Sequence, residues 1–75
     1  MAVKTFKHAS EVEFLLSGEV TWYDKHDRDV ERRRVLKGDR FVLRVEKDQD
    51  CPGAYRLIDE DGSYVVMDVA AFKLV

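Results

Sequence analysis

Three turn signals divide the second half of the chain into short segments: Gly38-Asp39, Cys51-Pro52-Gly53 and Asp61-Gly62. The runs beside these signals cover residues 41–47, 54–59 and 63–68, and they are rich in β-branched and aromatic side chains. Short runs of this composition, bounded by Gly, Pro and Asp, are typical of antiparallel strands joined by tight turns. Residues 35–75 are therefore predicted to form an antiparallel meander.

Apolar residues occur on both faces of these predicted strands. Leu43 lies on the face opposite Val42, and Val65 lies on the face opposite Val66, because successive side chains of a strand alternate. This mixture predicts a sheet that curves and closes on itself around a filled interior. Residues 69–71 fit a single 3₁₀ turn, and residues 72–75 are predicted to be the closing strand.

Residues 10–17 are the one segment predicted to be helical. Ser10 and Glu13 have the spacing of a capping box, in which each side chain bonds the backbone amide of the other residue. The apolar residues at helical spacing would face the core: Val12, Leu15 and Leu16. Phe14 falls off this stripe, so it is predicted to cover a sheet edge or to be exposed for a partner.

Residues 19–24 alternate apolar and polar side chains with the period of a strand. The segment 30–36 fits two structures. As a strand it would pair with 19–24 in a hairpin whose charged tip is 25–29. As a second short helix it would begin at Asp29, a favourable N-cap residue. The strand is preferred because this segment leads directly into the turn at Gly38-Asp39.

The length of 75 residues allows one domain, in which residues 1–18 form an N-terminal segment and residues 19–75 the β structure. Residues 3–7 are a candidate edge strand. The chain is 45% hydrophobic and 37% charged, which is too apolar for general disorder and too charged for a membrane protein. A single cysteine cannot form an internal disulfide, so we expect a reducing, cytoplasmic location.

The two parts of the chain differ in charge although the net charge is only -2. Residues 1–44 hold ten basic and eight acidic residues, whereas residues 45–75 hold three basic and seven acidic residues. This asymmetry predicts one basic and one acidic surface. The overall balance argues against a dedicated nucleic-acid-binding protein, whose footprint is usually strongly basic.

Residues 35–75 resemble an SH3-like barrel: a Lys-Gly-Asp turn at residues 37–39, three meandering strands, a one-turn helix and a short last strand. Together with the helix predicted at residues 10–17, the resemblance gives a mainly β (α+β) fold, a small SH3-like antiparallel β-barrel with one short N-terminal helix. It does not imply binding of proline-rich peptides, because Asp68-Val69-Ala70-Ala71-Phe72 replaces the Pro and Tyr of that family. Trp22-Tyr23-Asp24 matches its aromatic segment only in composition. The build is also similar to that of small bacteriophage accessory proteins that bind host proteins.

Three groups of chemically capable residues are better explained as solvated turns. The hairpin tip has Lys25 and Arg28 between its candidate metal ligands, which are Asp24, His26, Asp27 and Asp29. Cys51 lies close to two carboxylates that oppose its ionisation. The acids at 59–61 lie in a tight turn, where general acid–base catalysis gains no perturbed pKa. We expect no catalytic residue, metal or cofactor.

Arginines beside aromatic residues form the most distinctive predicted surface, a pairing used by protein hot spots and by platforms for single-stranded nucleic acid. The candidate binding residues are Trp22, Tyr23, Arg28, Arg32, Arg33, Arg34 and Arg40. In a strand, Arg32 and Arg34 point to one face and Arg33 to the other. Acidic residues expected to steer a basic partner are Asp48, Asp50, Asp59, Glu60 and Asp61.

The predicted function is that of a non-enzymatic, small protein-binding domain, a phage-type inhibitor or modulator that occupies the surface of a larger host protein. The alternative is a nucleic-acid-binding SH3-like module that uses the basic patch of residues 32–34. These two functions differ in salt dependence, because each phosphate contact adds roughly one to the slope of log affinity against log salt. We expect no membrane partner, and a monomer or a weak homodimer paired through an open sheet edge.

Overall fold

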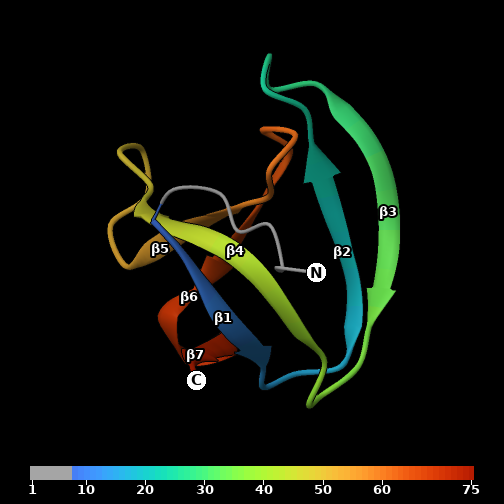
Figure 1. Ribbon diagram of the computed structural model, residues 1–75. Coiled ribbons are helices and arrows are strands. Elements are labelled where there is room, and N and C mark those ends of the chain that lie inside the picture. The colour runs from blue at the N-terminus through green and yellow to red at the C-terminus, as the bar shows by residue number, and fades with distance from the viewer. Residues whose placement is uncertain (1–7) are drawn as a thin grey trace, which may run out of the picture.

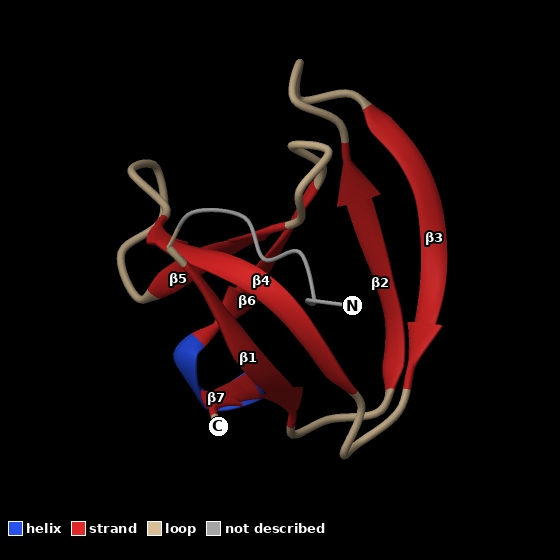
Figure 2. Ribbon diagram, viewed as in Figure 1, coloured by secondary structure: helices blue, strands red, loops and turns tan. Residues whose placement is uncertain are grey.

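The computed structural model describes residues 8–75, and these residues form a small, mainly β, antiparallel structure (Figure 1). Its elements, in chain order, are β1 (Ala9–Phe14), β2 (Gly18–Tyr23), β3 (Asp29–Val35), β4 (Arg40–Lys47), β5 (Ala54–Ile58), β6 (Tyr64–Asp68), η1 (Val69–Ala71) and β7 (Phe72–Leu74). A single 3₁₀ turn is thus the one helical element in this part of the chain (Figure 2). The predicted edge strand at residues 3–7 lies outside the described residues.

The strands form one curved sheet in the order β3-β2-β6-β5-β4-β1-β7. β4, β5 and β6 form the predicted meander. Lys47↔Tyr55 is the pair nearest the turn between β4 and β5, and Ala54↔Asp68 is one of the pairs between β5 and β6. The sheet is not closed, which corrects the prediction of a closed barrel. β3 and β7 are its two edges, because β7 pairs with β1 alone and β3 with β2 alone among the described strands.

The predicted helix at residues 10–17 is wrong, because most of that segment is strand β1. β1 lies between β4 and β7 and pairs with both, as in Val12↔Phe41 and Val12↔Leu74. A two-turn helix is unstable without tertiary support, whereas a strand in this position satisfies its backbone groups on both sides. The capping-box spacing was therefore fortuitous. Residues 9–14 are thus an inner strand of the sheet.

The change from helix to strand reverses which side chains are buried. Val12 and Phe14 are both fully buried, as expected for residues two apart on one face of a strand. Leu16, which the helix would have placed in the core, is 59% exposed. The backbone of Phe14 also holds the turn that precedes β4, because its N–H donates to Asp39 O and its carbonyl accepts from Gly38 N.

The hairpin of β2 and β3 is confirmed, and the alternative helix at residues 30–36 is wrong. The two strands pair from Gly18↔Val35 to Tyr23↔Asp29, with a bulge between Trp22 and Tyr23. β3 exposes every residue except Val35. Exposed charged side chains on an edge strand are one means by which proteins keep a sheet edge from pairing with other chains.

The predicted 3₁₀ turn and the last strand are also confirmed. Asp68 accepts a hydrogen bond from Ala70 N and so caps η1, and β7 follows at once. Gly62 takes a positive φ of 89° in the turn between β5 and β6, as its place in a tight hairpin turn predicts.

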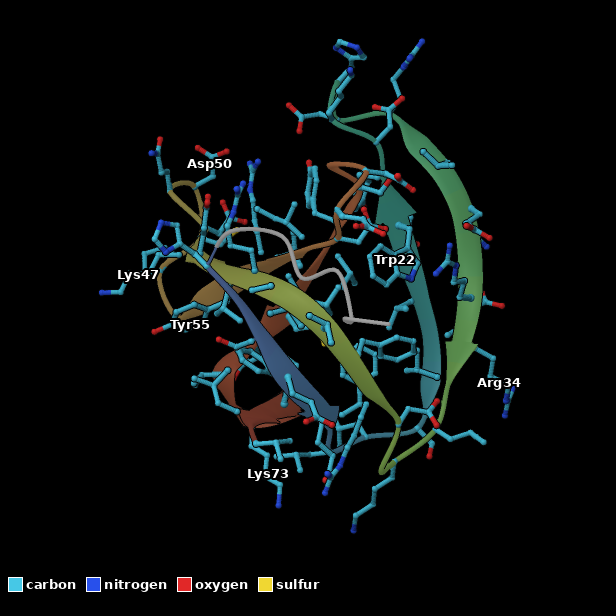
Figure 3. The ribbon with its side chains drawn as sticks, viewed as in Figure 1. Trp22, Arg34, Lys47, Asp50, Tyr55 and Lys73 are labelled. Carbon is cyan, nitrogen blue, oxygen red and sulfur yellow. The ribbon has the colours of Figure 1, made fainter. Side chains whose placement is uncertain are left out.

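The core lies inside the curve of the sheet. Its largest fully buried side chains come from β1, β5 and β6: Phe14, Leu57, Val12 and Val65. Trp22 of β2 joins them and is only 2% exposed. Figure 3 shows Trp22 pointing inward from β2, whereas Arg34 points away from β3. Among residues 8–75, no helix has the length and apolar character needed to cross a membrane.

Candidate functional site

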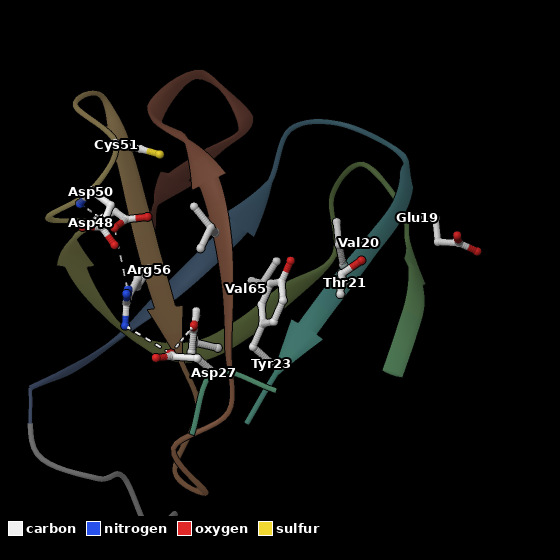
Figure 4. A pocket seen from close by; sticks show the side chains of 12 residues that line it. Glu19, Val20, Thr21, Tyr23, Asp27, Asp48, Asp50, Cys51, Arg56 and Val65 are labelled. Atoms are coloured by element: carbon white, nitrogen blue, oxygen red, sulfur yellow. Dashed lines mark hydrogen bonds and ion pairs between the residues drawn. The ribbon is translucent and has the colours of Figure 1, made fainter. Parts of the chain in front are cut away.

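A surface groove of about 630 Å³ runs between the β2–β3 hairpin and the loop that joins β4 to β5 (Figure 4). β2 forms one wall with Glu19, Val20 and Thr21, and the β4–β5 loop contributes Asp50 and Cys51 on the other side. The floor belongs to β6. A volume of this size falls within the range of 300–1,000 Å³ usual for ligand sites.

The groove runs along the edges of strands. Side chains alternate between the faces of a strand, so a cavity over one face touches every second residue. This groove instead touches the consecutive residues Glu19, Val20 and Thr21 of β2, and Tyr64, Val65 and Val66 of β6. Its lining therefore includes the backbone edges of both strands.

Those two edges are open over most of their length. β2 and β6 share a single residue pair, Tyr23↔Tyr64, at one end of the groove. Beyond that pair, residues 18–22 of β2 and 65–68 of β6 have no strand partner on the groove side within the described chain. Antiparallel pairing uses the backbone groups of alternate residues on each side of a strand. Every second residue of β2 therefore directs its N–H and C=O away from β3.

An aromatic and charged cluster closes the end of the groove where β2 and β6 meet. The rings of Tyr23 and Tyr64 stack with 5.4 Å between centroids. The guanidinium of Arg56 lies 4.6 Å from the centre of the Tyr64 ring. Arg56 also lies 3.9 Å from a carboxylate oxygen of Asp27 and 3.9 Å from one of Asp48. The cluster joins the hairpin tip to the β4–β5 loop.

Tyr64 is the most perturbed titratable group of the site. Burial, aided by the hydrogen bond that its hydroxyl donates to the Asp27 carboxylate, raises the pKa of Tyr64 to about 12. The hydroxyl is therefore protonated at neutral pH. It serves as a fixed donor that holds the hairpin tip against β6.

Asp24 holds the hairpin tip from the other side. Its Oδ1 accepts from the backbone amides of His26 at 2.8 Å and Arg28 at 3.0 Å, and its Oδ2 accepts from Arg28 Nε at 2.9 Å. The amide of Arg28 is the main cause of a lowered Asp24 pKa. Asp27 takes a positive φ of 62° in this turn, which Asp tolerates better than most residues.

The groove carries an excess of negative charge. Among the residues that the structure describes, four carboxylates line it, from Glu19, Asp27, Asp48 and Asp50, against one cation, Arg56. Arg56 lies near both Asp27 and Asp48, so Glu19 and Asp50 are the less compensated pair. An acidic cavity beside free strand edges suits a ligand with hydrogen-bonding groups and positive charge.

The predicted arginine surface lies on β3, on the side of the hairpin away from β6. Its faces are divided as expected for a strand, because Arg33 lies 4.9 Å from the centre of the Trp22 ring while Arg32 approaches Glu19 at 3.9 Å. Arg33 also donates to Glu31 at 2.6 Å. Acidic partners within the hairpin therefore offset part of this basic charge.

Three of the predicted binding residues have other surroundings than expected. Trp22 lies in the core, so its ring is not an exposed anchor. Arg28 is bound to Asp24 at the hairpin tip. Arg40 begins β4 and pairs with Glu11 and Glu13 of β1 at 3.7 and 3.1 Å, away from the arginines of β3. Tyr23, in contrast, lines the groove as part of the stacked pair.

The predicted acidic residues fall into two sets. Asp48 and Asp50 lie in the β4–β5 loop and line the groove, and Asp48 Oδ1 accepts from Asp50 N at 3.0 Å. Asp59, Glu60 and Asp61 form the turn between β5 and β6, where Asp59 Oδ1 accepts from the amides of Asp61 and Ser63. The first set is part of the groove and the second organises a turn.

Two of the groups that the sequence offers for chemistry are the candidate metal ligands of the hairpin tip and the thiol of Cys51. The described residues contain no cluster of His, Cys, Asp and Glu that could hold a metal ion. Cys51 is an exposed free thiol on the groove wall. Sequence reasoning did not select Arg56, Tyr64 or Thr21, because only the fold brings the edge of β2 beside β6.

Comparison of the chain with protein-family models, with curated proteins and with solved structures gives no match.

Proposed function

We propose that this chain is a non-enzymatic protein-binding domain whose groove between β2 and the β4–β5 loop receives a segment of a partner protein. The observation that carries the proposal is the groove itself, which runs along two open strand edges. Open edges are templates for pairing with another chain. Here they lie in a concavity, where a partner is bounded on both sides.

The finer fold proposal is an SH3-like module with an open sheet. Its support is the order of elements: a meander of β4, β5 and β6, the 3₁₀ turn η1, and a short β7. The β2–β3 hairpin then stands as a long insertion between β1 and β4. Fold alone does not give function, so the binding proposal depends on the groove.

Occupation of the groove offers a route to the modulation of a larger host protein, as the likeness to small phage proteins suggests. The domain would act in the cytoplasm, as a monomer or a weak homodimer, and would bind its target without catalysing a reaction. Nucleic acid is the alternative partner. It is disfavoured because the groove is acidic, Trp22 is buried away from any base, and Arg33 is already paired.

The test is affinity capture from a cell lysate with the full chain and two matched variants. Val66→Arg fills the groove floor, whereas Val30→Arg makes the same change on exposed β3; these valines are 37% and 53% exposed. We expect one captured protein that survives nuclease treatment, is retained by Val30→Arg and is lost by Val66→Arg. An Arg32→Glu/Arg34→Glu variant tests the β3 surface in parallel.

Two results would contradict the proposal. Capture that disappears with nuclease would favour the nucleic-acid alternative. A protein lost only by the Arg32→Glu/Arg34→Glu variant would place binding on β3 and away from the groove.

A further inference from the structure

We propose that the occupant of the groove is a single extended peptide segment with basic side chains, held by main-chain pairing to the open edges of β2 and β6. This inference rests on the proposed function and names the chemistry of the partner. It combines three observations: the open edges, the two walls, and the sign of the charge.

The open edges define a main-chain binding surface. Within residues 8–75, β2 has no partner for one side of its residues 18–22, and these five residues at about 3.3 Å each make roughly 17 Å of strand. Addition of a peptide strand to such an edge supplies affinity through backbone hydrogen bonds, and its side chains supply specificity. A bound segment of five or six residues would therefore cover the free edge.

The two walls favour a single peptide segment as the occupant of the groove, rather than the edge strand of a partner's folded sheet. β2 borders one side of the groove and the loop with Asp50 and Cys51 borders the other. A strand that already belonged to a sheet would bring its neighbouring strand into one of these walls. A flexible terminus or loop of a partner, free on both sides, avoids this clash.

The charge of the lining selects basic side chains. Asp50 places a carboxylate on the loop wall, and Glu19 adds a second one on the β2 side, toward Arg32 of β3. Asp50 has no ion pair within the described chain, and Glu19 has only a distant contact with Arg32 at 3.9 Å. Lysine or arginine side chains that alternate along an extended peptide would reach these walls.

The experiment uses fluorescein-labelled hexapeptides and fluorescence polarisation with the intact chain. The probe alternates lysine and valine, and its control alternates glutamate and valine. Two further peptides carry N-methyl groups on the lysines or on the valines, which removes amide donors without changing charge. We expect the lysine–valine peptide to bind at least tenfold more tightly than the glutamate control. At least one N-methylated peptide should lose tenfold or more, because several hydrogen bonds are lost.

Protein variants locate the site. Val66→Arg should weaken the lysine–valine peptide at least tenfold, whereas Val30→Arg should leave its affinity unchanged. Glu19→Gln with Asp50→Asn should weaken it about fivefold or more at low salt, and less at high salt because salt screens exposed charges. Amide NMR shifts on titration should concentrate at residues 18–22 and 65–68.

Several results would overturn this inference. If both N-methylated peptides bind as tightly as the unmethylated lysine–valine peptide, main-chain pairing is refuted. If the glutamate control binds as tightly as the lysine–valine peptide, recognition by charge is refuted. Self-association that Val66→Arg abolishes would identify a second copy of the chain as the occupant. If no peptide binds while a captured protein is still lost by Val66→Arg, the proposed function stands and the peptide chemistry is wrong. If Val66→Arg affects neither, both proposals fail.

Discussion

Replacement of Phe14 tests the strand assignment of β1 directly, because a strand buries Phe14 and exposes Leu16, whereas a helix would do the opposite. In the strand Phe14 is fully buried and Leu16 is 59% exposed. In the helix expected from the capping-box spacing, Leu16 faced the core and Phe14 did not. The two residues are therefore internal controls for each other.

The magnitude follows from burial. Phe14 packs against Phe41, with 5.2 Å between ring centroids, and truncation of a buried Phe to Ala costs about 3–5 kcal/mol. A domain of this length has roughly 4–11 kcal/mol of total stability, so Phe14→Ala removes a large share of it. Phe14→Leu, a milder change of shape, should cost about 1 kcal/mol. Leu16→Ala should stay within about 0.5 kcal/mol of wild type.

The assay is urea unfolding at 25 °C, followed by Trp22 fluorescence and by far-ultraviolet circular dichroism. With a slope near 1 kcal/mol per molar urea, the midpoint should fall by about 1 M for Phe14→Leu and about 3 M or more for Phe14→Ala. A Leu16→Ala midpoint that falls as far as that of Phe14→Leu would refute the strand register.

Three further predictions follow from the pKa of Tyr64, from two turn glycines and from Trp22. The pKa of Tyr64 is raised to about 12 from an unfolded value near 10, so the folded state favours the protonated phenol. Its stabilising contribution is therefore complete below pH 10 and is lost as pH rises from about 10 to 12. Absorbance titration at 295 nm should show a late step that Tyr64→Phe removes, and an unchanged late step in that variant would refute the assignment. Gly62→Ala should cost more free energy of unfolding than Gly38→Ala: both have positive φ, but only at Gly62 would the added Cβ meet a neighbour, at 3.3 Å. The positive φ alone costs about 1 kcal/mol or more, and equal unfolding midpoints would count against the Gly62 contact. Acrylamide should quench Trp22 weakly in the folded protein and strongly in urea, because the ring is 2% exposed; strong quenching of the folded protein would place the ring at the surface.

The local patterns that proved correct are those in which neighbouring residues alone set the structure. Gly62 after Asp61 predicted a tight turn, and Asp68 before three small residues was followed by a 3₁₀ turn that it caps. Alternation along β2, β4, β5 and β6 predicted strands. Each of these features depends on contacts within a few residues, so no knowledge of the fold was needed.

The β1 segment failed because its local and tertiary preferences differ. Ser10 and Glu13 fit a capping box, yet the spacing of Val12 and Phe14 also fits a strand. The segment is a strand because pairing with β4 and β7 satisfies its backbone groups on both sides and buries both apolar side chains. Trp22 was likewise assigned to the surface, since a sequence does not tell which face of a hairpin turns inward.

The sequence by itself determined the turns, most of the strands, the division of charge between the two parts of the chain, and the alternate directions of Arg32 and Arg33. Only the tertiary structure decided that β1 is an inner strand, that the sheet stays open, and that the edge of β2 lies beside β6 to form the groove. The physical reason is distance along the chain. Turns and alternation arise from adjacent residues, whereas the groove joins segments more than 40 positions apart whose approach depends on the packing of the whole core.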